Sequence, residues 1–173
     1  MEKHSGMITF GGNPLTLNGK LTKVGQKAED FTVLSVDLKP VKLSDFKGKK
    51  RLISVVPSID TGICDQQTRR FNEEAAKLEN TEILTISVDL PFALGRYCAT
   101  AGIDKIKTLS DHKDLDFGYK YGFVLEELRI LARGIIIIDK NDVVKYVEYV
   151  SEVGEHPNYD KALEEIKKLT IDR

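Results

Sequence analysis

Hydrophobic and polar residues are arranged in two different patterns along this chain, and the patterns predict strands and helices. Short β-branched runs bounded by turn residues indicate strands at 31–36, 41–43, 51–56, 82–88 and 135–139. The run 51–56 is strongly apolar and is therefore expected to be a central, buried strand. After Gly62, residues suited to a core recur every three or four positions, which predicts a helix with one buried face.

The order of these segments predicts the topology. Residues 7–10 and 15–17 flank a Gly-Gly-Asn-Pro turn, which indicates an N-terminal hairpin. Strand 51–56, the helix after Gly62, strand 82–88 and a helix over about 92–99 form a βαβ unit with parallel strands. Asp89 is expected to cap the second of these helices, with Pro91 in its first turn.

The remaining segments complete an α/β chain without a repeat or an interdomain linker. Residues 44–50 read as a polar turn and 122–127 as irregular chain. We expect a short strand and turn at 107–111, a short helix through Phe117 and Tyr119, a return strand at 143–150 and a closing helix at 159–169. The length of 173 residues suits one domain, so residues 1–173 are predicted to form a single domain.

Charge and hydropathy exclude some classes of partner. The chain has 26 basic and 27 acidic residues, spread evenly, with a net charge of −1. This balance argues against a nucleic-acid or membrane-surface partner, because such proteins carry a one-sided basic patch. The longest apolar run, 135–138, is too short to span a bilayer, and no apolar segment of signal-peptide type follows the N-terminus. A cytoplasmic protein is expected.

The two cysteines, Cys64 and Cys98, are too few for a disulfide scaffold. His4, His112 and His156 show no ligand spacing with each other or with the cysteines, so we expect no metal and no other cofactor. In the simplest interpretation each cysteine is a small buried hydrophobic residue.

The position of Cys64 favours a different interpretation. A buried strand leads through Pro57 and a polar turn to this cysteine, at the point where a helix begins. Backbone N–H groups and the positive end of the helix dipole meet there and favour the reactive thiolate. Cys64 is therefore predicted to be a redox nucleophile.

Three segments resemble a known family. Pro57-x-x-x-Thr61-x-x-Cys64 matches the peroxidatic motif of peroxiredoxins, and the run 57–64 resembles their thiol peroxidase branch, the atypical two-cysteine enzymes. The run 87–98 resembles the resolving-cysteine helix of that branch, and Leu131-Ala132-Arg133 resembles its arginine segment. The resemblance covers almost the whole chain. It implies a thioredoxin-like fold with a mixed central sheet flanked by helices and an N-terminal β-hairpin.

The resemblance also implies a role for each of five residues. Cys64 would be the peroxidatic cysteine and Cys98 the resolving cysteine, while Thr61 and Arg133 would act on the peroxide and the thiolate. Pro57 would shield the thiolate from water. Simpler roles stay open, because Thr61 also suits a helix cap and Pro57 a strand terminator. Without the resemblance Arg133 would be a surface charge, no better a candidate than Arg69, Arg70, Arg96 or Arg129.

The implied activity is the thiol-dependent reduction of hydrogen peroxide and organic hydroperoxides. The resemblance implies an intramolecular Cys64–Cys98 disulfide, reduction by thioredoxin or a similar dithiol, and a homodimer. Because the cysteines lie on separate predicted helices, we expect local unwinding when they join. Two alternatives are a peroxide sensor or redox relay that uses the same cysteines, and a thioredoxin-fold interaction module in which both are inert.

Overall fold

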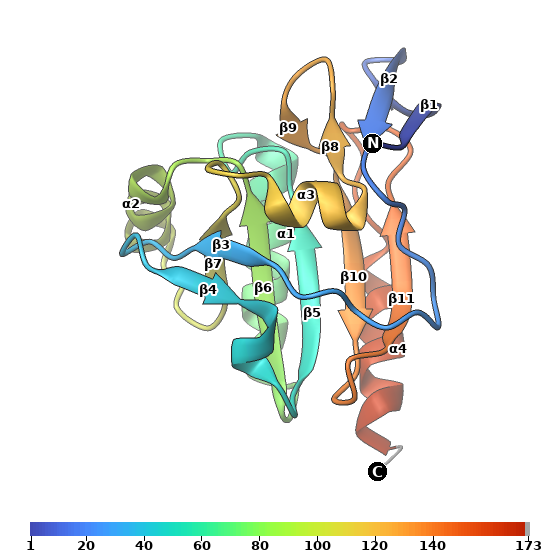
Figure 1. Cartoon of the computed structure of the whole chain (residues 1–173). Helices are drawn as coiled ribbons and strands as arrows, with labels where there is room; N and C mark the ends of the chain where they lie inside the picture. The colour runs from blue at the N-terminus through green and yellow to red at the C-terminus, as the bar shows by residue number, and fades with distance from the viewer. Residues whose placement is uncertain (172–173) are drawn as a thin grey trace.

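A seven-stranded mixed sheet forms the centre of the molecule, in a computed structural model that describes residues 1–171 (Figure 1). The strand order is β11 (Val144–Tyr149), β10 (Gly134–Ile138), β5 (Lys50–Val55), β6 (Thr81–Ser87), β7 (Lys107–Ser110), β3 (Thr32–Leu34) and β4 (Pro40–Lys42). Strands β5, β6 and β7 are parallel and are connected by α1 (Gly62–Ala75) and α2 (Pro91–Ala101). Strand β10 pairs antiparallel with β5. The predicted βαβ unit and the mixed sheet are both confirmed.

A second sheet of four antiparallel strands lies at one end of the first. The predicted N-terminal hairpin, β1 (Lys3–Phe10) and β2 (Asn13–Asn18), pairs with β8 (Val124–Leu125), which pairs with β9 (Ile130–Leu131). The prediction that 122–127 is irregular is therefore wrong at β8. Two-residue strands are too short to produce a periodic pattern, so only pairing with a distant hairpin defines them.

Two local predictions are corrected by the structure. The polar turn predicted from residue 44 is partly a 3₁₀-helix, η1 (Leu43–Phe46), whose two apolar ends are buried. Helix α2 has Pro91 in its first turn as predicted, but its N-cap is Leu90, and no side chain caps it. Asp89 is not the cap, because its carboxylate binds a different segment.

Residues of the central strands pack into two separate apolar layers, one on each face of the sheet. Leu52, Ile135 and Ile137 pack with residues of α1 and α4 (Tyr159–Ile171). Ile53, Val55 and their neighbours on β10 pack with residues of α3 (Asp116–Tyr121) on the opposite face. Figure 1 shows α1 and α4 behind the sheet and α3 in front of it. Alternate residues of a strand point to opposite faces, so a run of isoleucines supplies both layers.

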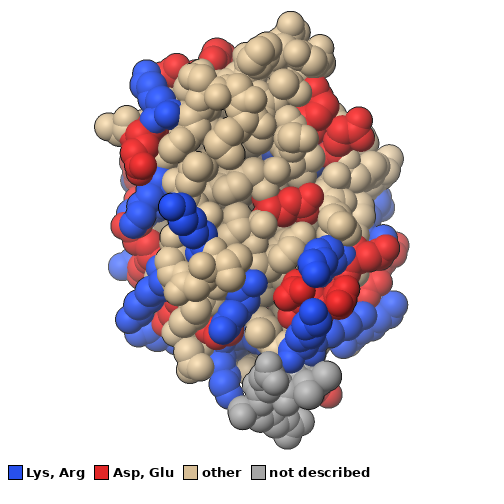
Figure 2. All heavy atoms as spheres, turned by 90° about the vertical axis from the view of Figure 1, so that its right-hand side faces the viewer, with Lys and Arg blue, Asp and Glu red and all other residues tan. Residues whose placement is uncertain are grey.

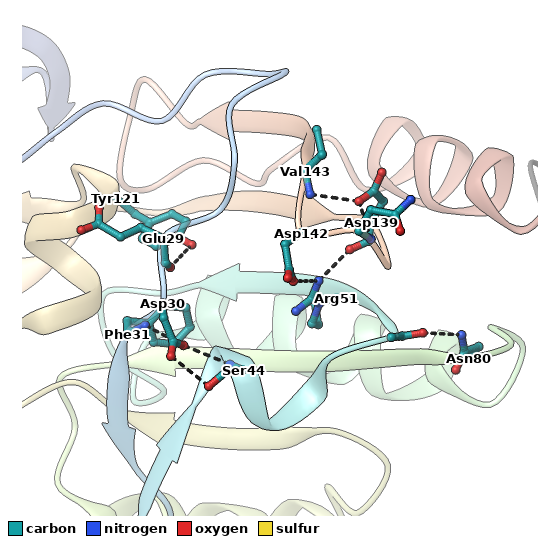
Figure 3. Close-up of polar contacts among 12 residues, drawn as sticks. Glu29, Asp30, Phe31, Ser44, Arg51, Asn80, Tyr121, Asp139, Asp142 and Val143 are labelled. Atoms are coloured by element: carbon teal, nitrogen blue, oxygen red, sulfur yellow. Dashed lines mark hydrogen bonds and ion pairs between the residues drawn. The ribbon is translucent and has the colours of Figure 1, made fainter.

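A buried arginine fixes the sheet at the amino end of β5 (Figure 3). Arg51 is fully buried, and its Nη2 donates to the Asp139 carbonyl at 2.6 Å and to Asp142 Oδ1 at 2.7 Å. These bonds hold the turn between β10 and β11 against the start of β5. The carboxyl end of β5, from which the Cys64 loop leaves, is at the other end of the strand.

The surface carries charges of both signs. Figure 2 shows basic and acidic side chains interspersed on the face that it presents. Several pair with each other on α4, as Lys161 does with Glu165 at 3.2 Å. Within residues 1–171, none of the helices is both long and apolar enough to cross a membrane.

Candidate active site

Cys64 lies in the first turn of α1. Thr61 is the N-cap of this helix, and its Oγ1 accepts a hydrogen bond from the Cys64 backbone N–H at 3.2 Å. Cys64 is fully buried and packs with Val56, Ile59 and Leu94. The thiol therefore sits at the amino end of a helix dipole, as its sequence position predicts, but inside an apolar cluster.

A pocket of about 370 Å³ opens beside this helix start. Pro57, Thr61 and Arg133, all singled out by the sequence, line it together, with Phe10 and Ile130 as apolar parts of its wall. Cys64 does not line the pocket, whereas Gly62 and Ile63, the two residues before it, do. The structure thus brings three of the five predicted residues to one cavity, and Cys64 is buried directly after two of the lining residues in the chain.

Arg133 is a buried cation at the start of β10, with only 1% of its surface exposed. Its Nε donates to the Val153 carbonyl at 3.0 Å, and its Nη1 donates to Gln67 Oε1 at 3.0 Å. A guanidinium has five N–H donors, and within residues 1–171 two of those of Arg133 have an acceptor. Among the residues that the structure describes, no carboxylate pairs with Arg133, and both of its hydrogen-bond acceptors are neutral.

Gln67 holds this arginine and was not predicted from the sequence. It is fully buried in α1, three residues after Cys64, and its Nε2 donates to Ser54 Oγ at 2.8 Å. The same amide group thus connects the carboxyl part of β5 with Arg133. Its signal was a polar residue at helical spacing on the buried face of α1, where only apolar or small residues were expected.

The pKa of Tyr159, at the start of α4, is affected by charges near the site. Burial raises the pKa of Tyr159, the positive charges of Arg133 and Arg70 lower it, and negative charge at Cys64 raises it. The phenol therefore lies within electrostatic range of both Arg133 and Cys64. The three residues come from α1, the start of β10 and α4, which only the fold brings together.

Cys98 occupies a different environment, on α2. Its sulfur lies 3.1 Å from Thr108 Oγ1 of β7, and the residue packs against the apolar layer that contains Phe71 and Ile103. Cys98 is partly exposed, and both cysteines are free thiols. The two cysteines belong to separate clusters, so the structure does not bring their sulfurs together.

Tyr97 connects the two cysteine-bearing helices. Its hydroxyl donates to Asp65 Oδ1 at 2.6 Å, from α2 to α1. Burial, followed by the hydrogen bond to Asp65, raises the pKa of Tyr97, so the phenol stays neutral and remains a donor. The Tyr97 ring packs against the Cys64 cluster and against the layer on which Cys98 sits. Residues adjacent to both cysteines thus hold α1 and α2 in contact.

Comparison with known proteins identifies close relatives. The chain matches the Redoxin family over residues 23–163. A protein named thiol peroxidase from Halalkalibacterium halodurans is 65% identical over 160 residues, which are 92% of this chain and 96% of that protein. A thiol peroxidase from Bacillus subtilis is 57% identical over 162 residues, 94% of this chain and 97% of its relative.

Solved structures show the same arrangement. A peroxiredoxin-like protein from Aquifex aeolicus superposes with a TM-score of 0.89 at 37% identity, covering 96% of this chain and 99% of the other. A thiol peroxidase from Chromobacterium violaceum superposes with a TM-score of 0.84 at 22% identity, covering 96% and 98% of the two chains. Because the second structure is only 22% identical, that comparison shows a shared fold and nothing more.

Proposed function

This chain belongs to the redoxin family and is a thiol-dependent peroxidase of the peroxiredoxin type, and on that premise we propose which residues carry out its reaction. Cys64 is the peroxidatic nucleophile and Cys98 the resolving thiol. Arg133 and Thr61 stabilise the charges that form in the pocket, and Pro57 limits the access of water. The substrates are hydrogen peroxide and organic hydroperoxides.

In the first step the Cys64 thiolate attacks the terminal oxygen of the hydroperoxide. A sulfur–oxygen bond forms, the oxygen–oxygen bond breaks, and the leaving alkoxide or hydroxide takes up a proton to give an alcohol or water. Cys64 becomes a sulfenic acid, which is a two-electron oxidation of the sulfur. Negative charge passes from sulfur to oxygen, so cationic and hydrogen-bonding groups that hold both atoms lower the barrier.

Arg133 suits this charge transfer because no carboxylate within residues 1–171 pairs with it. A buried cation without a counter-charge favours an anion beside it, whether a thiolate or a leaving oxygen. Thr61 contributes through its N-cap bond, which fixes the first turn of α1 at Cys64. The observation that carries this assignment is that Arg133 is buried, has no carboxylate partner in the described part of the chain, and lines one pocket with Thr61 and Pro57.

In the second step the Cys98 sulfur attacks the sulfenic sulfur of Cys64. A disulfide forms, and the sulfenic oxygen leaves as water. A disulfide requires Cα atoms within about 7 Å, and the cysteines start in separate clusters. Local unwinding of α2 and of the first turn of α1 therefore accompanies this step.

A dithiol protein of the thioredoxin type then reduces the disulfide. One of its thiolates attacks the Cys64–Cys98 bond, its second thiol releases the mixed disulfide, and two electrons return to this chain. We further propose that the enzyme acts in the cytoplasm as a homodimer, in keeping with the resemblance noted from its sequence.

A coupled assay with NADPH, thioredoxin reductase and thioredoxin tests this function. We expect wild type to consume both hydrogen peroxide and an organic hydroperoxide. Cys64→Ser should abolish turnover, and Cys98→Ser should retain only part of it. Arg133→Met should lower kcat/KM for peroxide by at least about a hundredfold, because it removes the charge that stabilises the transition state.

Arg129→Met is the matched control, because Arg129 is exposed and its guanidinium has one hydrogen bond within the described residues, from Nη2 to the His112 carbonyl at 3.3 Å. We expect this variant to retain activity within about twofold of wild type, as usual for an exposed residue that makes few contacts. Wild-type turnover that persists in Cys64→Ser, or an equal loss in both arginine variants, contradicts the proposed assignment.

A further inference from the structure

Asp89 lies between the two segments that carry the cysteines, in the connection from β6 to α2. Its side chain turns away from α2 toward the loop that leads to Cys64. Oδ1 accepts a hydrogen bond from Ser58 Oγ at 2.9 Å, and Oδ2 accepts one from the Ile59 backbone N–H at 2.9 Å. One carboxylate thus bonds to two consecutive residues of that loop.

The connection that carries Asp89 is itself fixed to the sheet. Ser87 Oγ, at the end of β6, donates to Asp89 Oδ2 at 2.7 Å, and Ser110 Oγ of β7 donates to the Asp89 carbonyl at 2.5 Å. A charged acceptor with three donors forms bonds stronger than neutral ones. Asp89 therefore fastens the Cys64 loop to a rigid part of the sheet, immediately before α2.

An apolar contact lies beside this polar one. Ile59, whose N–H binds Asp89, packs with Cys64 and with Leu94 of α2 in one buried cluster. The carboxylate of Asp89 and this cluster together hold the beginning of α2 against the Cys64 loop. Cys98, one turn beyond Leu94, instead contacts Thr108 and a different apolar layer.

We propose that Asp89 is a positioning residue that holds the Cys64 loop in its peroxide-reactive conformation and opposes the rearrangement that joins Cys64 to Cys98. The inference rests on the proposed resolving role of Cys98. The Asp89 bonds stabilise the closed arrangement, in which the cysteines are apart. Weakening them increases the population of open states in which the disulfide forms, and also loosens the site that meets peroxide.

The test separates the two chemical steps in Asp89→Asn. Because the chain has no tryptophan, each step is followed by rapid acid quench, thiol alkylation and mass spectrometry. We expect oxidation of Cys64 by peroxide to be about threefold to tenfold slower than in wild type, the size expected for the net contribution of one ordinary hydrogen bond, since asparagine keeps an acceptor oxygen. Formation of the Cys64–Cys98 disulfide should be faster by a similar factor, and excess peroxide should give less Cys64 sulfinic acid.

Ser58→Ala is a milder variant, since it leaves the Ile59 N–H bond to Asp89. It removes the Ser58 donor to Asp89 and the acceptor of the Asp60 backbone N–H at 3.2 Å. It should shift both rates in the same directions by a smaller factor. Asp60→Asn is the matched control, because it makes the same change of charge at an exposed position of the same loop. We expect wild-type rates for it in both steps.

Opposite changes in the two rates distinguish positioning from a general loss of structure, which slows both. Slowing of both steps in Asp89→Asn and Ser58→Ala, or unchanged rates in a folded Asp89→Asn, overturns the inference alone. A wild type that forms no Cys64–Cys98 disulfide overturns the proposed function and this inference with it.

Discussion

At the scale of single residues, the charge of Arg133 is decided by its neighbours. Gln67 and the Val153 carbonyl orient the guanidinium without neutralising it. At an effective dielectric constant of about 20, two opposite charges about 4 Å apart attract by about 4 kcal/mol. A carboxylate in place of the Gln67 amide would form an ion pair with Arg133 and neutralise its charge. The neutrality of Gln67 therefore keeps Arg133 available to anions in the pocket.

Gln67→Glu tests this role of neutrality. The substitution keeps an oxygen for Arg133 Nη1 but adds a counter-charge, so kcat/KM for hydrogen peroxide should fall by at least about tenfold in a folded protein. The coupled assay measures the activity of each variant, and circular dichroism shows whether the variant is folded. Asn141→Asp makes the same change from amide to carboxylate at an exposed turn position that does not line the pocket, so it is the control and should stay within about threefold of wild type. Equal activities of the two variants would contradict this account of Arg133.

At the scale of elements, the sequence predicted those whose pattern is long and local. Strand β5, helix α1, strand β6 and helix α2 follow in the predicted order, because strong apolar periodicity marks each of them. Strands β8 and β9 and the role of Asp89 could not be predicted in this way, because contacts between distant segments define them.

The same difference between local patterns and distant contacts decides which residues of the candidate site the sequence could predict. Pro57, Thr61 and Cys64 form one local motif at a strand–helix junction, so the sequence could place them together. Only the resemblance to a family points to Arg133, and Gln67 lies outside the apolar pattern that predicts α1. The catalytic roles of Cys64, Cys98, Thr61, Arg133 and Pro57 stay predictions.

Helix α3 depends on a buried carboxylate that titrates. Asp111 is almost fully buried, and its two oxygens accept hydrogen bonds from the backbone N–H groups of Phe117 and Gly118 at 3.1 and 2.8 Å. Burial raises the pKa of Asp111 to about 7, although these two N–H groups lower it. An acid whose pKa is raised on folding contributes stability below its unfolded pKa, and this contribution is lost as the pH rises through the folded value.

Asp111→Asn tests this linkage, because asparagine does not titrate. From about pH 4 to 7 the wild type should lose unfolding free energy relative to the variant, by up to about 1.4 kcal/mol per pH unit. Urea unfolding at several pH values measures the difference. A constant difference between the two proteins across this range would contradict the assigned titration.

At the scale of the whole molecule, the two ends of β5 have different tasks. Its carboxyl end leads to the Cys64 loop, while Arg51 at its amino end binds the turn between β10 and β11. Stability and chemistry are thus expected to respond to different substitutions. The assignment of residues 1–173 to one domain stays a prediction. If it is right, the chain should unfold cooperatively in a single transition.

Asp142→Asn separates these tasks. Asp142 has a left-handed backbone with φ of 64°, which asparagine tolerates, so the main effect is the loss of the carboxylate that pairs with Arg51. We expect a loss of about 1–3 kcal/mol in unfolding free energy, in a single transition, with unchanged kcat/KM. Asp104→Asn, at an exposed position, should unfold like wild type. Loss of activity in a folded Asp142→Asn, or two separate transitions, would contradict this division.

The most direct test of the account is mass spectrometry of the reduced protein after one equivalent of peroxide. The wild type should lose the mass of two hydrogens and yield a cross-linked peptide that joins Cys64 to Cys98. The Cys98→Ser variant should instead gain one oxygen on Cys64. A wild type that remains unmodified, or that retains oxygen on Cys64 and never forms the cross-link, would contradict the assignment of Cys64 and Cys98 to successive steps of one reaction.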